Sequence, residues 1–323
     1  MRKLTVTVDV TGHAPKGCRR VEVGLFIPTD FDAGAALWCC VPGGGMNRAY
    51  FDLDVPPAVG DYSMARFAAD RGQVVLTIDP PGIGGSDAPD DGYQLTPRSL
   101  ADTLDHVVAE VRNRLADGVL DGAPPISCAV TVGIGHSAGA LLVACQQGRG
   151  RTYDAVALLG FSNRGLPSVL TPEEAAFTDR PEELAAGLAD LVRARFGDPF
   201  PLLANPSTGI DAGSVHPAPL QAAFDRAGDR LLGLVGMAAL VPGSIQRELA
   251  RIDVPTLVAI GEHDIAGTIG ALPRQLPACH DLTLLTLAGT GHNHNWADSR
   301  LALWDRLVGW VSSLQPREPR ETG

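Results

Sequence analysis

Short runs of apolar residues recur through the first half of the chain and are typical of β-strands. Residues 4–10 and 21–27 alternate polar and apolar side chains, which predicts an antiparallel pair of strands. Residues 35–41 form a continuous apolar run, the pattern of a strand that is buried on both faces of a sheet. The remaining strands predicted in this part of the chain are 74–78, 128–134 and 154–160.

Helical patterns lie between these strands. Residues 96–116 place Leu100, Leu104 and Val107 on one face, which predicts a long amphipathic helix. Residues 61–71 predict a shorter helix that is closed by a glycine. Because strands that alternate with helices build a parallel sheet, we expect an α/β fold with a doubly wound, mostly parallel sheet.

The alternation stops after residue 160. Residues 161–252 contain no convincing strand, but leucine and valine recur at helical spacings near 180–196 and 218–240. We interpret residues 161–252 as a helical lid inserted into a core that comprises residues 1–160 and 253–323. The elements expected after the lid are strands at 255–260 and 282–287 and a helix at 299–314.

Composition limits the class of protein. The net charge of −11 and the pI near 5.1 disfavour nucleic acid and anionic membranes as partners. The six cysteines show no Cys-x-x-Cys spacing, so neither a disulfide framework nor a thiolate metal site is expected. The strand-like first residues lack the apolar core of a signal peptide, and no apolar run approaches the ~20 residues of a membrane span. These features predict a soluble, cytoplasmic protein whose oligomeric state stays unknown.

One motif connects the strand at 128–134 to a helix-favouring segment. It is the pentapeptide Gly135–Gly139, which reads Gly-His-Ser-Ala-Gly. A strand, a Gly-x-Ser-x-Gly turn and a helix together expose a serine hydroxyl on a strained turn, with glycines on either side that let neighbouring backbone pack closely. Ser137 is therefore the candidate nucleophile.

A serine nucleophile needs a base, and the base needs a carboxylate that orients it. Asp264 follows the strand at 255–260, and His292 lies on the glycine-rich loop that follows the strand at 282–287. Parallel strands bring their carboxyl ends to one edge of the sheet, so both residues are expected near Ser137. Glu262 and His294 are the nearest alternatives for the acid and the base.

The order Ser137, Asp264, His292, each at a strand end, resembles the serine hydrolases of the α/β-hydrolase superfamily. The resemblance extends from about residue 21 to residue 314. It implies that Ser137 is the nucleophile, His292 the general base and Asp264 the acid that orients it.

The same resemblance places an oxyanion loop after the third strand, where this chain has Pro42–Met46. The family usually has His-Gly at the start of this loop, whereas this chain has Pro-Gly. We expect the backbone amide of Gly44, with Gly45 as the alternative, to act together with the amide of Ala138. Two further candidates for the substrate-binding site are Met46 and His136.

Serine at position 137 argues against the epoxide hydrolases and haloalkane dehalogenases of this fold, which use an aspartate nucleophile. The resemblance then implies hydrolysis of a carboxylic ester, thioester or lactone of a mid-sized, largely apolar small molecule, through an acyl-enzyme. Carbon–carbon bond hydrolysis, acyl transfer and a binding-only role are the alternatives. The sequence contains no His-x-x-x-His or His-Glu-x-x-His motif, so no metal and no cofactor are expected.

Overall fold

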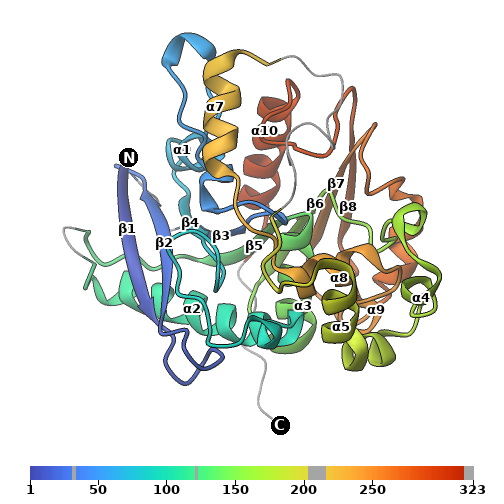
Figure 1. The fold of residues 1–323 in the computed structure, drawn as a ribbon. Helices are drawn as coiled ribbons and strands as arrows, with labels where there is room; N and C mark the ends of the chain where they lie inside the picture. Colours follow the sequence, from blue (N-terminus) through green and yellow to red (C-terminus); the bar gives the residue numbers. More distant parts are fainter. Residues whose placement is uncertain (31–33, 121–122, 203–215, 316–323) are drawn as a thin grey trace.

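The structure is a computed structural model that describes residues 1–30, 34–120, 123–202 and 216–315. Its centre is one sheet, in which eight strands from the described residues follow the order β1-β2-β4-β3-β5-β6-β7-β8 (Figure 1). The strands are β1 (Arg2–Asp9), β2 (Arg20–Ile27), β3 (Ala36–Val41), β4 (Val74–Ile78), β5 (Val130–His136), β6 (Ala155–Leu159), β7 (Thr256–Gly261) and β8 (Leu282–Leu287).

The direction of the strands confirms the predicted doubly wound, mostly parallel α/β sheet. β2 is antiparallel to both β1 and β4, and the other neighbouring strands are parallel. In the parallel part, Val41 of β3 pairs with Gly135 of β5, and His136 pairs with Leu159 of β6. The carboxyl ends of these strands therefore meet at one edge of the sheet, which is where such folds bind ligands.

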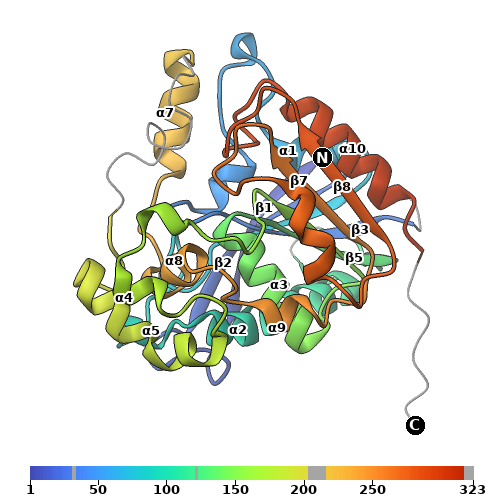
Figure 2. The same cartoon turned by 90° about the vertical axis from the view of Figure 1, so that its right-hand side faces the viewer.

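Helices cover both faces of the sheet. Apolar side chains of α2, α3, α5 and α8 pack in one hydrophobic cluster, and those of α1, α7 and α10 pack in a second cluster on the opposite face. Figure 2 shows the two groups of helices from the side. The α-helices among the described residues are α1 (Met64–Ala69), α2 (Pro97–Asp117), α3 (Ala138–Gly150), α4 (Pro172–Ala175), α5 (Pro181–Phe196), α7 (Ala218–Ala227), α8 (Gly233–Leu240), α9 (Gln246–Leu249) and α10 (Arg300–Ser312).

Two element boundaries differ from the expected ones for visible reasons. α1 begins at Met64 and not at residue 61, because the Ser63 side chain accepts a hydrogen bond from the backbone N–H of Arg66 and so caps the helix. β5 continues through His136, two residues beyond the expected end, because its last residues still pair with β3 and β6.

The segment predicted as a lid contributes to both hydrophobic clusters. α8 and α9 pack against α3, and α5 packs against α8, whereas α7 lies beside the short 3₁₀ helix Arg48–Phe51 (Figure 1). Residues 203–215 of this segment and residues 316–323 of the predicted core lie outside the described residues. The division of the chain into core and lid stays a prediction.

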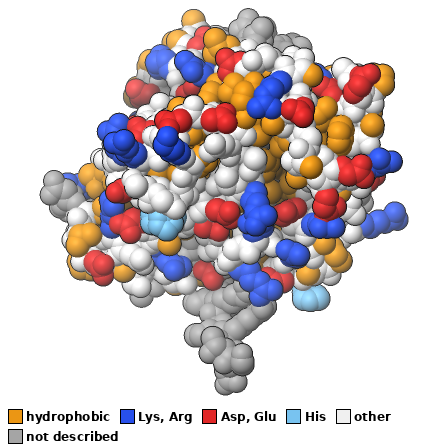
Figure 3. Space-filling view, turned by 60° about the horizontal axis from the view of Figure 1, so that its bottom comes forward, with side chains coloured by type: hydrophobic (Ala, Val, Ile, Leu, Met, Phe, Trp, Pro, Cys, Tyr) orange, Lys and Arg blue, Asp and Glu red, His pale blue; other side chains and the backbone are white. Residues whose placement is uncertain are grey.

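The six cysteines all lie within the described residues and are free thiols. Within the described ranges, no helix has the length and apolar character required to cross a membrane. On the face shown in Figure 3, acidic and basic side chains alternate, and hydrophobic side chains gather in its upper part. This face therefore carries no single-sign charged patch.

Candidate active site

Ser137 lies on a sharp turn between β5 and α3. Its backbone has φ 53° and ψ −119°, a conformation that non-glycine residues rarely adopt. A Cβ at Gly139 would lie 2.1 Å from the carbonyl oxygen of Val41, and one at Gly135 would lie 2.4 Å from Cα of Ala140. Only glycine fits at these two positions, so the spacing of the motif follows from close packing of the turn against β3 and α3.

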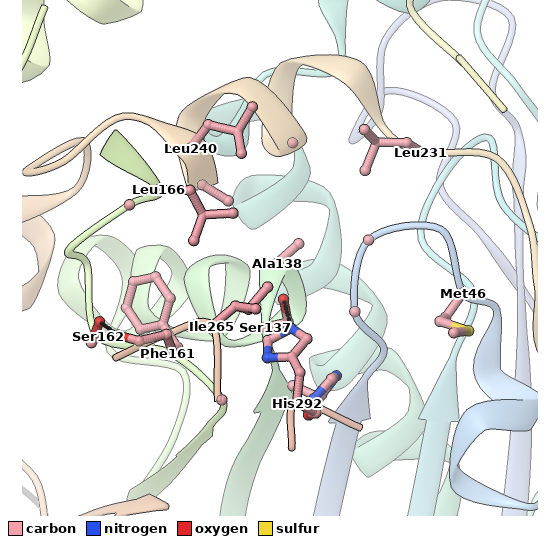
Figure 4. Close-up of a pocket in the computed structure, with 18 of the residues that line it drawn as sticks. Met46, Ser137, Ala138, Phe161, Ser162, Leu166, Leu231, Leu240, Ile265 and His292 are labelled. Carbon is pink, nitrogen blue, oxygen red and sulfur yellow. Dashed lines mark hydrogen bonds between the residues drawn. The ribbon is translucent and has the colours of Figure 1, made fainter. Parts of the chain in front are cut away.

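Asp264 and His292 come from the loops that follow β7 and β8. Nε2 of His292 lies 2.8 Å from Oγ of Ser137, and Nδ1 of His292 lies 2.6 Å from Oδ1 of Asp264. His292 and Asp264 are buried, whereas Ser137 is partly exposed. The structure thus brings the three residues singled out in the sequence into one hydrogen-bonded chain. Figure 4 shows Ser137 and the His292 ring side by side.

The Asp264 carboxylate has donors on both oxygens. The backbone N–H of Ala266 donates to Oδ1 over 2.9 Å and that of Gly261 to Oδ2 over 3.3 Å. Nε2 of His294 lies 3.1 Å from Oδ2. Burial alone would raise the pKa of Asp264, but the hydrogen bonds from His292 and His294 outweigh it and hold that pKa far below its usual range. The carboxylate is therefore ionised at neutral pH.

His136 is a lining residue of the cavity at Ser137, and its ring contacts the loop that carries His292. Its Nε2 donates to the backbone oxygen of His292 over 2.7 Å, and its ring stacks on Tyr50 with 4.7 Å between ring centroids. Burial lowers the pKa of His136 well below its ordinary value, and the nearby His292 and His294 rings lower it further. A neutral His136 thus fixes the backbone that carries His292.

The glycine loop after β3 lies next to the nucleophile. A Cβ at Gly43 would lie 3.4 Å from Cβ of Ser137, and one at Gly44 would lie 3.5 Å from Cβ of Ala138. Ala138 opens α3, so its amide has no acceptor within the helix. Gly45 lies further back, outside the cavity at Ser137, and its carbonyl accepts a hydrogen bond from the backbone N–H of Asp229 over 2.7 Å.

A cavity of about 430 Å³ opens over Ser137 (Figure 4). Leu166, Leu231 and Leu240 lie above the serine, and Met46 lies on the side of the glycine loop. Histidines aside, Arg195 is the one charged residue among the described lining residues. Its Nη1 pairs with Oε2 of the buried Glu174 at 2.6 Å. The described lining residues contributed by the segment 161–252 are Phe161, Ser162, Asn163, Gly165, Leu166, Arg195, Phe196, Leu231, Gly236, Ala239 and Leu240.

The two rival residues lie in different environments. Glu262 is exposed, and its Oε2 accepts a hydrogen bond from the backbone N–H of Gly289 over 2.8 Å, away from the imidazole of His292. His294 is buried, but it faces the far oxygen of Asp264 and not Ser137. Among the described residues, no group of three or more histidine, cysteine or acidic side chains has the arrangement of a metal site.

Sequence reasoning missed the contacts that hold the glycine loop in place. Gly228, which follows α7, forms an antiparallel bridge with Met46 of this loop, and the side chain of Leu231 lies next to Gly44. Leu231 reaches the cavity, and the Asp229 carboxylate also accepts from the backbone N–H of Gly84 over 2.9 Å. No local pattern in residues 228–231 signals these contacts, because they depend on how the insertion returns across the sheet edge.

Solved structures with this fold include enzymes of several kinds. An enol-lactonase from Burkholderia xenovorans LB400 is 20% identical, with a TM-score of 0.57 over 91% of this chain and 97% of that chain. The thioesterase domain from the curacin biosynthetic pathway is 14% identical, with a TM-score of 0.59 over 96% and 99%. A loop variant of a haloalkane dehalogenase from Bradyrhizobium elkanii is 14% identical, with a TM-score of 0.60 over 96% and 97%. At these identities, the likeness shows the fold alone.

No curated protein matches the sequence. Residues 40–303, which include every residue of the site described above, match the alpha/beta hydrolase family. The chain therefore belongs to the alpha/beta hydrolase family.

Proposed function

We propose that the protein is a serine hydrolase that cleaves a carboxylic ester, thioester or lactone through an acyl-enzyme on Ser137. The observation that carries the proposal is the continuous hydrogen-bonded chain from Ser137 through His292 to Asp264, at the floor of a largely apolar cavity. Each link has the length that proton transfer and imidazole orientation require.

In acylation, Oγ of Ser137 attacks the substrate carbonyl carbon, and Nε2 of His292 takes the hydroxyl proton. Asp264 accepts the hydrogen bond from Nδ1 of His292 and stabilises the imidazolium that forms. The backbone N–H groups of Gly44 and Ala138 stabilise the oxyanion. His292 then gives its proton to the leaving oxygen or sulfur as the carbonyl–heteroatom bond breaks.

In deacylation, a water molecule takes the place of the leaving group. His292 removes a proton from the water as its oxygen attacks the acyl carbon, and returns that proton to Oγ of Ser137 when the acyl–serine bond breaks. Because the imidazole must be neutral at both steps, kcat/KM should rise with pH through a single ionisation and then level off.

The lining of the cavity supports a mid-sized, largely apolar substrate. The leucines above Ser137 and the ring of Phe161 form an apolar wall, and Arg195, the one lysine or arginine among the described lining residues, is paired with Glu174. We propose that residues 161–252 act as the lid that determines substrate choice, because half of the described lining residues belong to this segment.

The relatives of known structure leave several reactions open. Lactone and thioester hydrolysis are named for two of them, and dehalogenation is named for a third. Serine at position 137 favours acyl chemistry over the aspartate-based dehalogenase reaction. Carbon–carbon bond hydrolysis and acyl transfer use the same three residues and remain the alternatives.

A fluorophosphonate probe tests the proposal directly, because it reacts covalently with activated serines. The native protein should be labelled, and Ser137→Ala should not. Nitrophenyl esters of graded chain length, a thioester, a lactone and a vinylogous diketone should then identify the reaction. If neither labelling nor turnover occurs with a correctly folded protein, the binding-only alternative replaces the proposal.

A further inference from the structure

The carboxylate of Asp264 holds two imidazoles at once. Nδ1 of His292 lies 2.6 Å from Oδ1, and Nε2 of His294 lies 3.1 Å from Oδ2. The mechanism proposed above uses only His292. His294 is 1% exposed and does not belong to the described lining of the cavity, so it is not placed to contact substrate.

The surroundings of His294 determine which of its nitrogens carries hydrogen. An ionised carboxylate only accepts hydrogen bonds, so Nε2 of His294 must donate to Asp264. Nδ1 of His294 is buried and has no hydrogen-bond partner among the described residues. The carboxylate thus fixes the hydrogen of His294 on Nε2.

We propose that His294 is a positioning residue that holds the Asp264 carboxylate with Oδ1 turned towards His292. This inference rests on the proposed roles of Ser137, His292 and Asp264. Without the donor from His294, Oδ2 loses one of its two hydrogen bonds, and the backbone N–H of Gly261, at 3.3 Å, is the bond that stays. The orientation of the carboxylate about its Cβ–Cγ bond would then be less restricted, because only this longer bond holds Oδ2.

The hydrogen bond from His294 to Asp264 also limits how strongly Asp264 holds a proton on His292. A second donor spreads the negative charge of the carboxylate and so weakens its attraction for the imidazolium. The titratable groups that face this carboxylate are His292 and His294 from the loop after β8 and His136 from the end of β5. From its own loop, Glu262 and His263 are exposed, and the Glu262 carboxylate accepts from the backbone N–H of Gly289.

Three variants separate the hydrogen bond from the bulk of the side chain. His294→Leu removes the donor, His294→Gln keeps an N–H group at a similar distance from the backbone, and His263→Gln replaces an exposed histidine next to Asp264 in the chain. In His294→Leu, kcat for a nitrophenyl ester should fall roughly 10- to 100-fold with KM nearly unchanged. The acidic limb of kcat/KM should move to higher pH by roughly half a unit.

His294→Gln should recover most of kcat and the original pH profile, and His263→Gln should match the native enzyme throughout. Thermal unfolding of each variant verifies that it is folded. A His294→Leu enzyme with native kcat and pH profile would overturn the inference. An equal loss of kcat in His294→Leu and His294→Gln would also overturn it, because the hydrogen-bond donor at position 294 would then not determine the rate.

A second measurement does not depend on turnover. In protein with ¹⁵N-labelled histidine, the ring signals of His292 can be assigned from their absence in His292→Gln and followed against pH by NMR. Their titration midpoint should rise in His294→Leu and stay at the native position in His294→Gln. If the native protein cleaves none of the substrates, the proposed function fails, but this comparison still decides whether His294 acts on His292 through Asp264. An unchanged midpoint in His294→Leu would refute the inference.

Discussion

Ser137 combines a positive φ with a hydroxyl that is accessible from the cavity. Its backbone N–H donates to the carbonyl oxygen of Leu159 over 2.7 Å, which ties the turn to β6. Strained backbone persists only where its surroundings impose it, and here the close packing of two glycines and this hydrogen bond do so. The conformation therefore does not depend on the serine side chain.

It follows that Ser137→Ala should abolish hydrolysis and leave the thermal unfolding temperature nearly unchanged. Because the three residues act as a unit, His292→Ala should lower kcat almost as much, on the order of 10⁴- to 10⁶-fold, and Asp264→Asn somewhat less. Rates measured with the best nitrophenyl ester test this. Near-native activity in His292→Ala, together with loss of activity in His294→Ala, would show that His292 is not the general base.

His136 makes stability depend on pH. Its folded-state pKa lies well below the value of 6.5 that applies in the unfolded chain, because it is buried and close to His292 and His294. Below about pH 6.5 the unfolded chain therefore binds a proton that the folded chain does not, and the free energy of unfolding falls by up to about 1.4 kcal/mol per pH unit. This contribution is fully present above pH 6.5 and is lost as the pH falls.

His136→Gln keeps a donor for the backbone oxygen of His292 but does not titrate. Its free energy of unfolding, measured with urea between pH 7 and pH 5, should decline less steeply than that of the native protein. Parallel curves for the two proteins would show that His136 is not the group responsible.

The three residues of the proposed triad could be identified from the sequence because each follows a strand whose apolar run is visible by itself. The contact between His294 and Asp264 could not. His292 and His294 are two positions apart on a loop, and loop residues have no fixed periodicity that predicts which side chains turn the same way. Only the folded loop shows that both rings reach one carboxylate.

At the scale of elements, the position of α3 depends on Gly139, which has no side chain. Gly139 allows the first turn of α3 to lie against the backbone of Val41 and Pro42, at the end of β3. This contact holds β3 and α3 in place relative to each other. The two proposed oxyanion donors therefore belong to elements in direct backbone contact.

Gly139→Ala should destabilise the protein by about 1–3 kcal/mol, because the new Cβ would meet backbone atoms that cannot move aside easily. The matched control is Gly309→Ala in α10, where nothing lies within 4 Å of the new Cβ. That change should stabilise the protein by roughly 0.5–1 kcal/mol, since alanine restricts the unfolded chain. Urea unfolding of both variants measures the difference, and equal effects would contradict this account.

The boundaries of elements were predictable where local sequence sets them. The strand at residues 74–78 and the strand at 282–287 have the predicted ends, because polar or turn-forming residues flank both runs. The end of β5 was not predictable, since Gly135 and His136 are strand residues only by virtue of their partners on β3 and β6. Pairing across the sheet is not visible in a local pattern.

At the scale of the whole molecule, the segment 161–252 does two things. Leu184, Leu188 and Val192 of α5 pack in the cluster on one face of the sheet, and Leu220 and Phe224 of α7 pack in the cluster on the other. Other residues of the segment line the cavity. Deleting the whole segment would therefore remove core side chains as well as the proposed lid.

Single substitutions in the wall test the role of this segment in substrate choice more cleanly. Leu166→Trp should lower kcat/KM for long-chain esters by roughly tenfold or more relative to acetate esters, because it narrows the cavity. The control is Val169→Trp, a nearby residue that is 46% exposed and lies outside the described cavity lining. Equal chain-length preference in the native protein and in Leu166→Trp would argue against a lid that selects substrate.

The contacts of Gly228, Asp229 and Leu231 with the glycine loop have a kinetic consequence. Leu231 meets whatever occupies the cavity, while Asp229, two residues earlier, is hydrogen-bonded to Gly45, the neighbour of Gly44. We therefore expect an acyl chain that presses on Leu231 also to displace the amide that is proposed to receive the developing charge. Across a homologous series of esters, we expect the Michaelis constant and the turnover number to change together rather than independently.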